Sequence, residues 1–244
     1  MTDAGPMLVV CAHPGDFVWR AAGAIALAVA EDRQVTIVCL SYGERGESAG
    51  LWRAGKNLEE IKAVRRDEGQ RAADALGAKI EFLDAGDYPL VETAALLDEL
   101  VRIYRRIAPS VVLTHAAEDP YNADHPVAAA IARKARILAQ APGVAPGTGD
   151  VLGAPPVFCF EPHQPEMCGF RPDVLLDITP VWDRKRAAME QLAAQGHLLE
   201  YYTDLGRRRC VQARRNSGPN LGLPADSYGE AYQRVFPLVT RTLA

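Results

Sequence analysis

Apolar residues gather in short continuous runs at intervals along this chain. Six of these runs are predicted strands, namely Met7–Ala12, Val35–Ser41, Ile80–Asp84, Ser110–His115, Val157–Glu161 and Val174–Ile178. A continuous apolar run, unlike strict alternation of apolar and polar residues, is typical of a strand that is buried on both faces. The pattern therefore favours a largely parallel sheet.

Longer segments with helical spacing lie between these runs. The predicted helices are Phe17–Glu31, Leu58–Leu76, Ala94–Ile107, Pro126–Gln140 and Thr179–Thr203. At the start of the last one, Thr179 suits the N-cap and Pro180 suits the first helical position. The alternation of strands and helices predicts an α/β, Rossmann-like fold with a mostly parallel sheet and helices on both faces.

The C-terminal part of the chain has a less regular pattern. The segment 206–224 (Gly206–Pro224) is basic and rich in glycine, so we expect an irregular loop there, close to any functional site. Ser227–Val235 is expected to form a final short helix. Because we find no internal repeat and no clean linker, we expect residues 1–244 to form a single domain.

Composition and charge exclude several classes of protein. The chain has 244 residues, of which 48% are hydrophobic and 24% charged, and these values are typical of a globular protein. A net charge of -4 argues against a nucleic-acid partner. No apolar stretch approaches the ~20 residues that a membrane span requires, so we expect no membrane partner either.

The cysteines and the N-terminus bear on location. Five cysteines are present, an odd number without a CxxC pair, and the first six residues lack the features of a secretory signal. Three of the cysteines lie in apolar runs, where a free thiol behaves as a small hydrophobe. A reducing, cytoplasmic location is therefore expected.

Residues able to carry chemistry follow several predicted strands. His13 and Asp16 follow the first strand, His115 and His125 follow the fourth, and His163 follows the fifth. In an open parallel sheet, ligands bind outside the carboxyl ends of the strands. Four of the five histidines are thus expected on one rim of the sheet, whereas the fifth, in the last long helix, is expected to have a packing or surface role.

His13, Asp16 and His125 form a candidate metal site. Two histidines and a carboxylate, with one coordination position left open, are typical ligands of a catalytic zinc ion. Taken singly, Asp16 can equally be a helix N-cap and His125 a residue ahead of proline at a helix start, but their occurrence together favours a metal. Asp124 is then a candidate partner that orients a ligand histidine, or else a solvated loop carboxylate.

Two other residues are candidates for proton transfer. Glu47 lies in a glycine-rich loop and can act as a general base if it overhangs the metal, although a turn with exposed charges has the same pattern. His163 lies between Pro162 and Pro165 and can act as a general acid or base. A loop histidine bonded to backbone is the alternative.

The segments His13-Pro14-Gly15-Asp16 and Asp124-His125 resemble the PIG-L (LmbE-like) family of zinc-dependent deacetylases. The resemblance implies a Rossmann-like fold with Zn2+ held by His13, Asp16 and His125. That family usually carries an aspartate as general base at the position of Gly15, and a histidine that stabilises the oxyanion at the position of Asn122. The metal site is therefore kept in this sequence, whereas the groups needed for amide hydrolysis are absent.

One branch of the family departs in the same way, and the chain is similar to it over nearly its whole length: the 4-oxalomesaconate (4-carboxy-2-hydroxymuconate) hydratases of gallate and protocatechuate 4,5-cleavage. The most specific matching stretches are Gly43-Glu44-Arg45-Gly46-Glu47-Ser48 and Glu161-Pro162-His163-Gln164-Pro165-Glu166. The resemblance implies a hydro-lyase that adds water to a small tricarboxylate and gives 4-carboxy-4-hydroxy-2-oxoadipate. It also implies a homo-oligomer.

This resemblance assigns expected roles. Zinc acts as a Lewis acid on the substrate, Glu47 is the expected base and His163 the expected acid, and these two roles are exchangeable. Residues expected to bind the substrate carboxylates are Arg20, Arg45, Asn122 and Arg215. Any one of these arginines can equally be a surface charge. The tail that carries Arg215 is expected to close the site of its own chain or of a neighbouring one.

Two alternatives remain open from the sequence. The first is a zinc-dependent N-deacetylase with an unusual base. The second is a binding module that has kept the fold and lost the chemistry.

Overall fold

Seven strands form one sheet in the computed structural model, which describes residues 5–144, 151–215 and 218–239. The strands are β1 (Met7–Cys11), β2 (Val35–Cys39), β3 (Lys79–Phe82), β4 (Val111–Thr114), β5 (Val157–Phe160), β6 (Val174–Asp177) and β7 (Gly229–Arg234). Their order is β3-β2-β1-β4-β5-β7-β6. The first five strands run parallel, whereas β7 is antiparallel to both of its neighbours.

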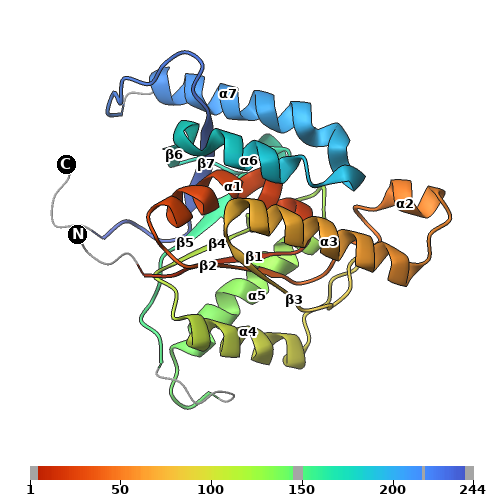
Figure 1. Cartoon of the computed structure of the whole chain (residues 1–244). Helices are drawn as coiled ribbons and strands as arrows, with labels where there is room; N and C mark the ends of the chain where they lie inside the picture. The colour runs from red at the N-terminus through yellow and green to blue at the C-terminus, as the bar shows by residue number, and fades with distance from the viewer. Residues whose placement is uncertain (1–4, 145–150, 216–217, 240–244) are drawn as a thin grey trace.

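Helices cover both faces of this sheet, as Figure 1 shows. The helices are α1 (Pro14–Ala30), α2 (Ala49–Arg53), α3 (Leu58–Leu76), α4 (Ala94–Ile107), α5 (Asp124–Ala139), α6 (Trp182–Met189) and α7 (Leu199–Arg215). α1, α3, α6 and α7 lie on one side, and α4 and α5 lie on the other. Each layer packs its own cluster of buried apolar side chains against the sheet, and every residue of β1 and β2 is buried. The predicted fold class is confirmed.

All six predicted strands are present, with ends that differ by a few residues from the apolar runs. Two helices begin earlier than predicted: α1 starts at Pro14 rather than Phe17, and α5 starts at Asp124 rather than Pro126. Both early turns carry candidate site residues. The five cysteines are buried free thiols. Within the described residues, no helix combines the length and the apolar character that a bilayer crossing requires.

The prediction for Ser227–Val235 is wrong, because this segment forms strand β7 instead of a helix. β7 pairs with β5 on one side and with β6 on the other. Its buried Glu230 also accepts hydrogen bonds from the backbone amides of Gly23 and Ala24, at 2.7 and 2.9 Å. Two open strand edges therefore decide the conformation of a segment whose own sequence is a weak strand signal.

The expectation of an irregular segment 206–224 is also corrected, because α7 continues through Arg215. Gly206 does not end the helix. A Cβ atom added there would lie 3.3 Å from a ring carbon of Tyr228 and 3.6 Å from Trp182, so the glycine permits close packing of α7. The described residues from 218 to 224 carry no helix or strand.

The predicted helix Thr179–Thr203 is broken into pieces. A short 3-10 turn (Thr179–Val181) leads into α6, and a second (Ala193–Leu198) leads into α7. Gln195 has non-helical dihedral angles (φ -122, ψ 20) at the break. The backbone N–H of Ala194 donates to buried Glu68 of α3, at 2.9 Å, so contacts with α3 stabilise the break. This break brings Gln195 and His197 to the rim of the sheet.

A candidate metal and active site

The turn between β1 and α1 positions the first two candidate ligands. His13 is the N-cap of α1, and its backbone N–H donates to Asp16 Oδ2 at 2.8 Å, which closes a capping box. The N-cap is therefore His13 and not Asp16, as one alternative from the sequence had it, although Asp16 supports the cap from the third helical position. Its other oxygen, Oδ1, lies 3.2 Å from His125 Nε2 at the start of α5. One carboxylate thus fixes the turn and faces the second histidine.

His13, Asp16 and His125 are all buried, and one potential ligand atom of each lies within 4.8 Å of the others. His13 Nδ1 and His125 Nε2 have no hydrogen-bond partner among the described residues, although burial without a partner is costly for a polar atom. A cation bound between them and Asp16 would satisfy both nitrogens. The donor set therefore fits a divalent metal such as zinc.

The opposite nitrogen of each histidine is held by a carboxylate. His13 Nε2 lies 3.1 Å from Asp124 Oδ2, and His125 Nδ1 lies 2.7 Å from Asp119 Oδ2. Metal-binding histidines are usually oriented in this way, because the carboxylate fixes the tautomer and the ring direction. The expected contact between Asp124 and a ligand histidine is present.

A second grouping, His13 with Asp87 and Asp124, also has the spacing of a metal site. Its carboxylates are already occupied by backbone amides. Asp87 accepts from the amides of Arg45 and Gly46, and Asp124 accepts from those of Tyr88 and Leu90. The first grouping is the better metal candidate because its unpaired atoms are ligand nitrogens.

Burial and charge act against each other in this cluster. Burial alone would raise the pKa of Asp16, but His125 and His115 hold that pKa well below its usual value. Burial alone would lower the pKa of His13, yet the carboxylates of Glu47 and Asp124 raise it well above the usual value. The cluster therefore favours positive charge at its centre, which a bound cation would supply.

His115, which directly follows β4, packs against the candidate ligand His125. Its ring stacks on that of His125 with 4.2 Å between centroids, and its Nε2 accepts from the backbone amide of Ala12 at 3.0 Å. Burial lowers the pKa of His115 to about 3, so this imidazole is neutral. His13, His115 and His125 thus lie together, with the rings of His13 and His115 5.5 and 4.2 Å from that of His125, and His163 lines the same cavity as His125.

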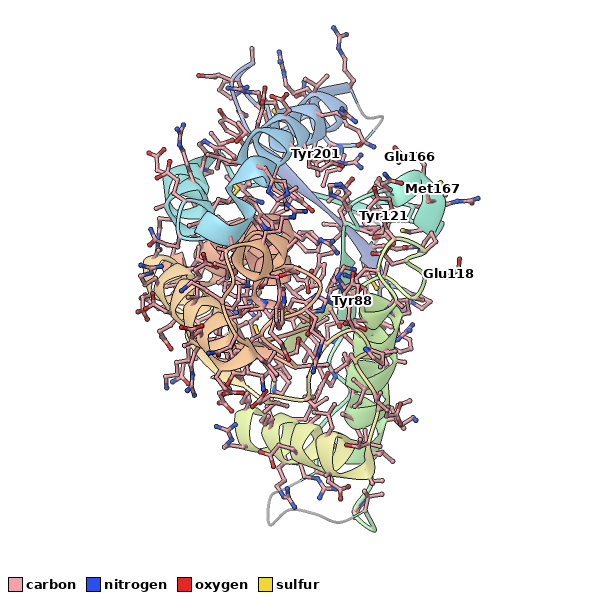
Figure 2. The ribbon with its side chains drawn as sticks, turned by 90° about the vertical axis from the view of Figure 1, so that its right-hand side faces the viewer. Tyr88, Glu118, Tyr121, Glu166, Met167 and Tyr201 are labelled. Atoms are coloured by element: carbon pink, nitrogen blue, oxygen red, sulfur yellow. The ribbon has the colours of Figure 1, made fainter. Side chains whose placement is uncertain are left out.

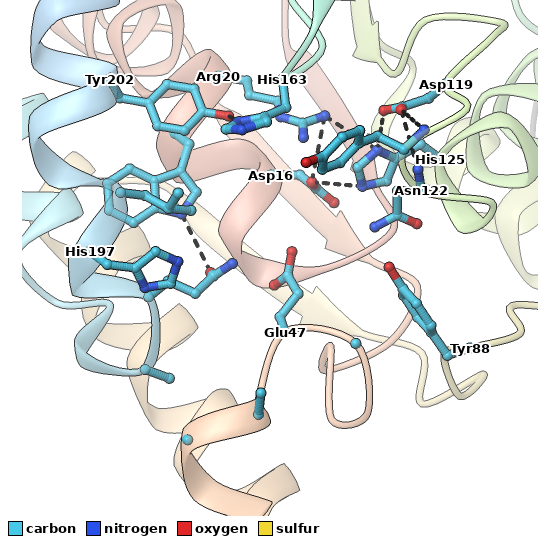
Figure 3. A pocket seen from close by; sticks show the side chains of 18 of the residues that line it. Asp16, Arg20, Glu47, Tyr88, Asp119, Asn122, His125, His163, His197 and Tyr202 are labelled. Carbon is cyan, nitrogen blue, oxygen red and sulfur yellow. Dashed lines mark hydrogen bonds and ion pairs between the residues drawn. The ribbon is translucent and has the colours of Figure 1, made fainter.

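A cavity of about 640 Å³ opens over these ligands, and Figure 3 shows side chains that line it. Its wall includes Glu47, Arg20, Asn122 and His163, which were predicted site residues. In Figure 3 the carboxylate of Glu47 and the ring of His163 lie on either side of Asp16. The structure thus brings Asp16, His125 and both candidate proton-transfer residues to one cavity, with His13 buried beside Asp16 and His125.

Glu47 enters the cavity because the loop that carries it is tightly fixed. Gly43 has a φ of +66, a left-handed conformation that favours glycine, and the Ser48 hydroxyl donates to its carbonyl at 2.8 Å. Buried Asp87 accepts from the amides of Arg45 and Gly46. The loop is therefore an ordered support, whereas a turn with exposed charges was the alternative.

His163 lies on the opposite wall and is half-buried. The hydroxyl of Tyr201 donates to the His163 carbonyl at 2.6 Å, and the hydroxyl of Tyr202 lies 3.5 Å from its Nδ1. Burial lowers the pKa of His163, and the nearby Arg20 lowers it further. Arg20 Nη1 itself lies 3.8 Å from Asp16 Oδ1 and 3.4 Å from His125 Nδ1.

Two predicted substrate-binding residues do not line this cavity. The side chain of Arg45 is 47% exposed, and its guanidinium donates to the backbone carbonyl of Asp87. Arg215 is exposed near the end of α7 and lines a different cavity with Arg214 and Asn220. Their role in substrate binding stays a prediction.

Several residues of the site were missed in the sequence. Tyr88, from the loop after β3, lines the cavity with a φ of +46, and Figure 2 shows it with Tyr121 and Tyr201 along one side of the molecule. Gln195 and His197 line the opposite side of the cavity, in the part of the chain that was predicted as one helix. No local pattern identified these residues.

Gly15 is explained by its surroundings. A Cβ atom at this position would lie 2.4 Å from Gln195 Oε1 and 3.0 Å from Glu47 Oε2. These two side chains therefore occupy the volume into which a residue at position 15 would extend. Asn122, the other departure, lines the cavity while its Oδ1 accepts from the Asp124 amide at 3.0 Å.

The fold and the site define an enzyme of the LmbE-like type, and comparisons with known proteins agree. The family model described as PIG-L, GlcNAc-PI de-N-acetylase, matches residues 8–136, and the chain belongs to this family.

Particular relatives are more informative than the family. The chain is 53% identical over 238 residues to the 4-oxalmesaconate hydratase of Pseudomonas putida. The matched region covers 97% of this chain and 92% of the relative. The crystal structure of GalB, the 4-carboxy-2-hydroxymuconate hydratase from Pseudomonas putida KT2440, matches with a TM-score of 0.93 and 51% identity over 98% of this chain and 99% of that one.

A more distant structure shares the fold. The N,N'-diacetylchitobiose deacetylase from Pyrococcus horikoshii matches with a TM-score of 0.75 and 21% identity, over 96% of this chain and 84% of that one.

Proposed function

We propose that this protein is a hydro-lyase that adds water to 4-oxalomesaconate (4-carboxy-2-hydroxymuconate) and forms 4-carboxy-4-hydroxy-2-oxoadipate. The observation that carries this proposal is the likeness to a hydratase of this name over nearly the full length of both chains. The N-deacetylase alternative is weaker, because Gly15 offers no proton acceptor at the start of α1 and the space beside it is already filled.

His13, Asp16 and His125 would hold the metal, which we propose to be Zn2+. Support comes from the two buried imidazole nitrogens without partners and from the carboxylate that backs each ring. When bound, zinc would supply Lewis acidity toward the 2-oxo or enol oxygen of the substrate.

Glu47 is the proposed proton acceptor for the attacking water. Its side chain is only 11% exposed, and Arg65 Nη2 donates to its Oε2 at 2.7 Å, a charge-assisted hydrogen bond. The other oxygen, Oε1, remains directed toward the metal cluster, 3.5 Å from His13 Nδ1.

His163 is the proposed proton donor to the substrate carbon. In the free protein its pKa is lowered by burial and by Arg20, so the imidazole is mostly neutral at neutral pH. A substrate with three carboxylates would raise this pKa on binding, because negative charge favours the protonated imidazole. Substrate binding would thus favour protonation of His163, which then donates this proton in the reaction.

Arg20 and Asn122 are the proposed anchors for substrate carboxylates within the cavity. A buried guanidinium is well suited to this role because it offers two donors to a carboxylate. The cytoplasmic location and the homo-oligomeric state stay predictions, which cell fractionation and light scattering would check.

The direct test mixes zinc-loaded protein with freshly generated 4-carboxy-2-hydroxymuconate and follows the loss of the conjugated absorbance. We expect a fast decay that a chelator abolishes and added zinc restores, with the hydroxy acid as product. A panel of N-acetylated sugars serves as the control. Absence of decay with zinc bound, together with release of acetate from the panel, would replace the hydratase by the deacetylase.

A further inference from the structure

A fully buried arginine lies directly behind Glu47. Arg65 of α3 has no exposed surface, and its side chain bonds to two carboxylates. Nη2 donates to Glu47 Oε2 at 2.7 Å and Nη1 donates to Glu68 Oε2 at 2.6 Å. Nε donates to the backbone carbonyl of Tyr42 at 3.3 Å, next to the glycine-rich loop. Arg65 thus connects α3 to both the loop and the side chain of Glu47.

The bond from Arg65 divides the two oxygens of Glu47. Oε2 is engaged by the guanidinium, whereas Oε1 lies 3.5 Å from His13 Nδ1, which is itself an unpaired candidate ligand atom. A carboxylate so close to a zinc site is a competent zinc ligand if it is free to turn. Something must therefore keep Glu47 from occupying the coordination position that the substrate needs.

Gln195 lies beside Arg65 and shares its guanidinium with Glu47. Its Oε1 accepts from Arg65 Nη2 at 3.2 Å and from Trp19 Nε1 at 3.4 Å. This carboxamide oxygen and Glu47 Oε2 are the atoms that a Cβ at Gly15 would meet. The volume behind Glu47 is therefore filled, and the guanidinium is the donor that fixes its orientation.

We propose that Arg65 is a positioning residue that holds Glu47 beside the metal site, so that Glu47 accepts a proton instead of becoming a metal ligand. The expected effect on kcat rests on the proposed function. The restraint of Glu47 by Arg65 does not, because it is tested by zinc affinity without substrate.

The kinetic test is a double-mutant cycle of Arg65→Met and Glu47→Gln. If Arg65 acts through Glu47, Arg65→Met lowers kcat by about 10²-fold, the cost of a misplaced catalytic group, with little change in KM. In the Glu47→Gln background the same change lowers kcat by no more than about threefold, because residues that act as a unit are not additive. An equal loss in both backgrounds would show that Arg65 acts in another way.

The second readout is zinc affinity, measured by competition with a chromogenic chelator in the absence of substrate. Arg65→Met is expected to strengthen zinc binding by about tenfold, because the released carboxylate can join the ligands. Adding Glu47→Gln should remove that gain. Unchanged or weaker binding in Arg65→Met would overturn the proposal even if the hydratase activity is confirmed. If wild-type protein hydrates nothing, this readout still tests the restraint, so the two failures are distinguishable.

Two further variants separate positioning from folding. Arg136→Met removes another buried arginine, which donates to the Pro155 carbonyl far from the cavity, and should leave kcat and zinc affinity unchanged. Arg65→Lys keeps the charge and should retain part of the activity that Arg65→Met loses. If Arg65→Met does not fold, Arg65→Lys is carried through the same cycle, with a smaller loss expected that again disappears beside Glu47→Gln.

Discussion

The candidate metal ligands and the two proposed proton-transfer residues are held in different ways. The proposed metal ligands, called the metal wall here, are His13 and Asp16 within one helical turn and His125 at the start of α5. All three are buried, and a carboxylate lies behind each histidine. Glu47 and His163, which flank this wall on two sides, come from loops and depend on contacts with distant segments. Arg65 reaches Glu47 from α3, and Tyr201 and Tyr202 reach His163 from α7.

The difference teaches which kind of site a sequence reveals. Ligands set by one turn and by helix starts keep their spacing along the chain, so a motif exposes them. Glu47 and His163 have no such spacing, so the sequence named them only as candidates with alternatives. It did not reveal the distant residues that hold them. The comparison predicts that substitutions in the metal wall remove metal and activity together, whereas substitutions at Glu47 or His163 remove activity alone.

The largest expected effect is that of His125→Ala. Without this imidazole the metal site loses one of its three ligands, so we expect zinc content to fall well below one per chain. Turnover should fall by about 10⁴-fold or more, because Lewis-acid stabilisation is worth several kcal/mol. Metal analysis and absorbance kinetics check both values. Full zinc content with normal turnover would place the metal elsewhere.

Glu47→Gln should show most clearly that activity can be lost while zinc is retained. The amide keeps the shape of the side chain but is not a proton acceptor, so kcat should fall by about 10³-fold. Zinc content should stay near one per chain, since Glu47 is outside the group of three proposed ligands. Loss of zinc in this variant would make Glu47 part of the metal wall and break the comparison.

Asp124→Asn tests the support behind the metal wall. The carboxylate bonds His13 Nε2 and the amides of Tyr88 and Leu90, so its loss should weaken zinc binding by about 10- to 100-fold. Asp87→Asn is the matched control, because Asp87 supports the Glu47 loop and belongs to the other possible metal grouping. We expect unchanged zinc affinity there, and a loss would favour that second grouping.

The smallest effect is a slope in the pH profile. Because burial and Arg20 lower the pKa of His163 below its ordinary value, the protonated fraction in the free protein falls as pH rises from 7 to 8. If His163 is the acid, kcat/KM should fall about tenfold over this unit, and His163→Ala should lose the slope. A profile that rises over the same interval would exchange the roles of Glu47 and His163.

Two predictions for the C-terminal part of the chain were wrong. Gly206 suggested an irregular tail, yet it allows α7 to pack against Tyr228, and a predicted helix proved to be β7. In both places the neighbouring elements override a weak local preference. A stronger clue was present in α3, where Ile61, Arg65, Glu68 and Ala72 share one buried face. Two charged residues on an otherwise apolar face indicate a buried ionic network.

By itself, the sequence determined the parallel core and the metal-ligand candidates, because continuous apolar runs and one helical turn are local features. Only the tertiary structure decided that Arg65 and Gln195 lie together beside Glu47, because 130 residues separate Arg65 from Gln195 along the chain. It also decided that Arg45 faces solvent while Tyr88 faces the cavity. Such contacts depend on how separate elements fill a shared volume, which no local pattern records.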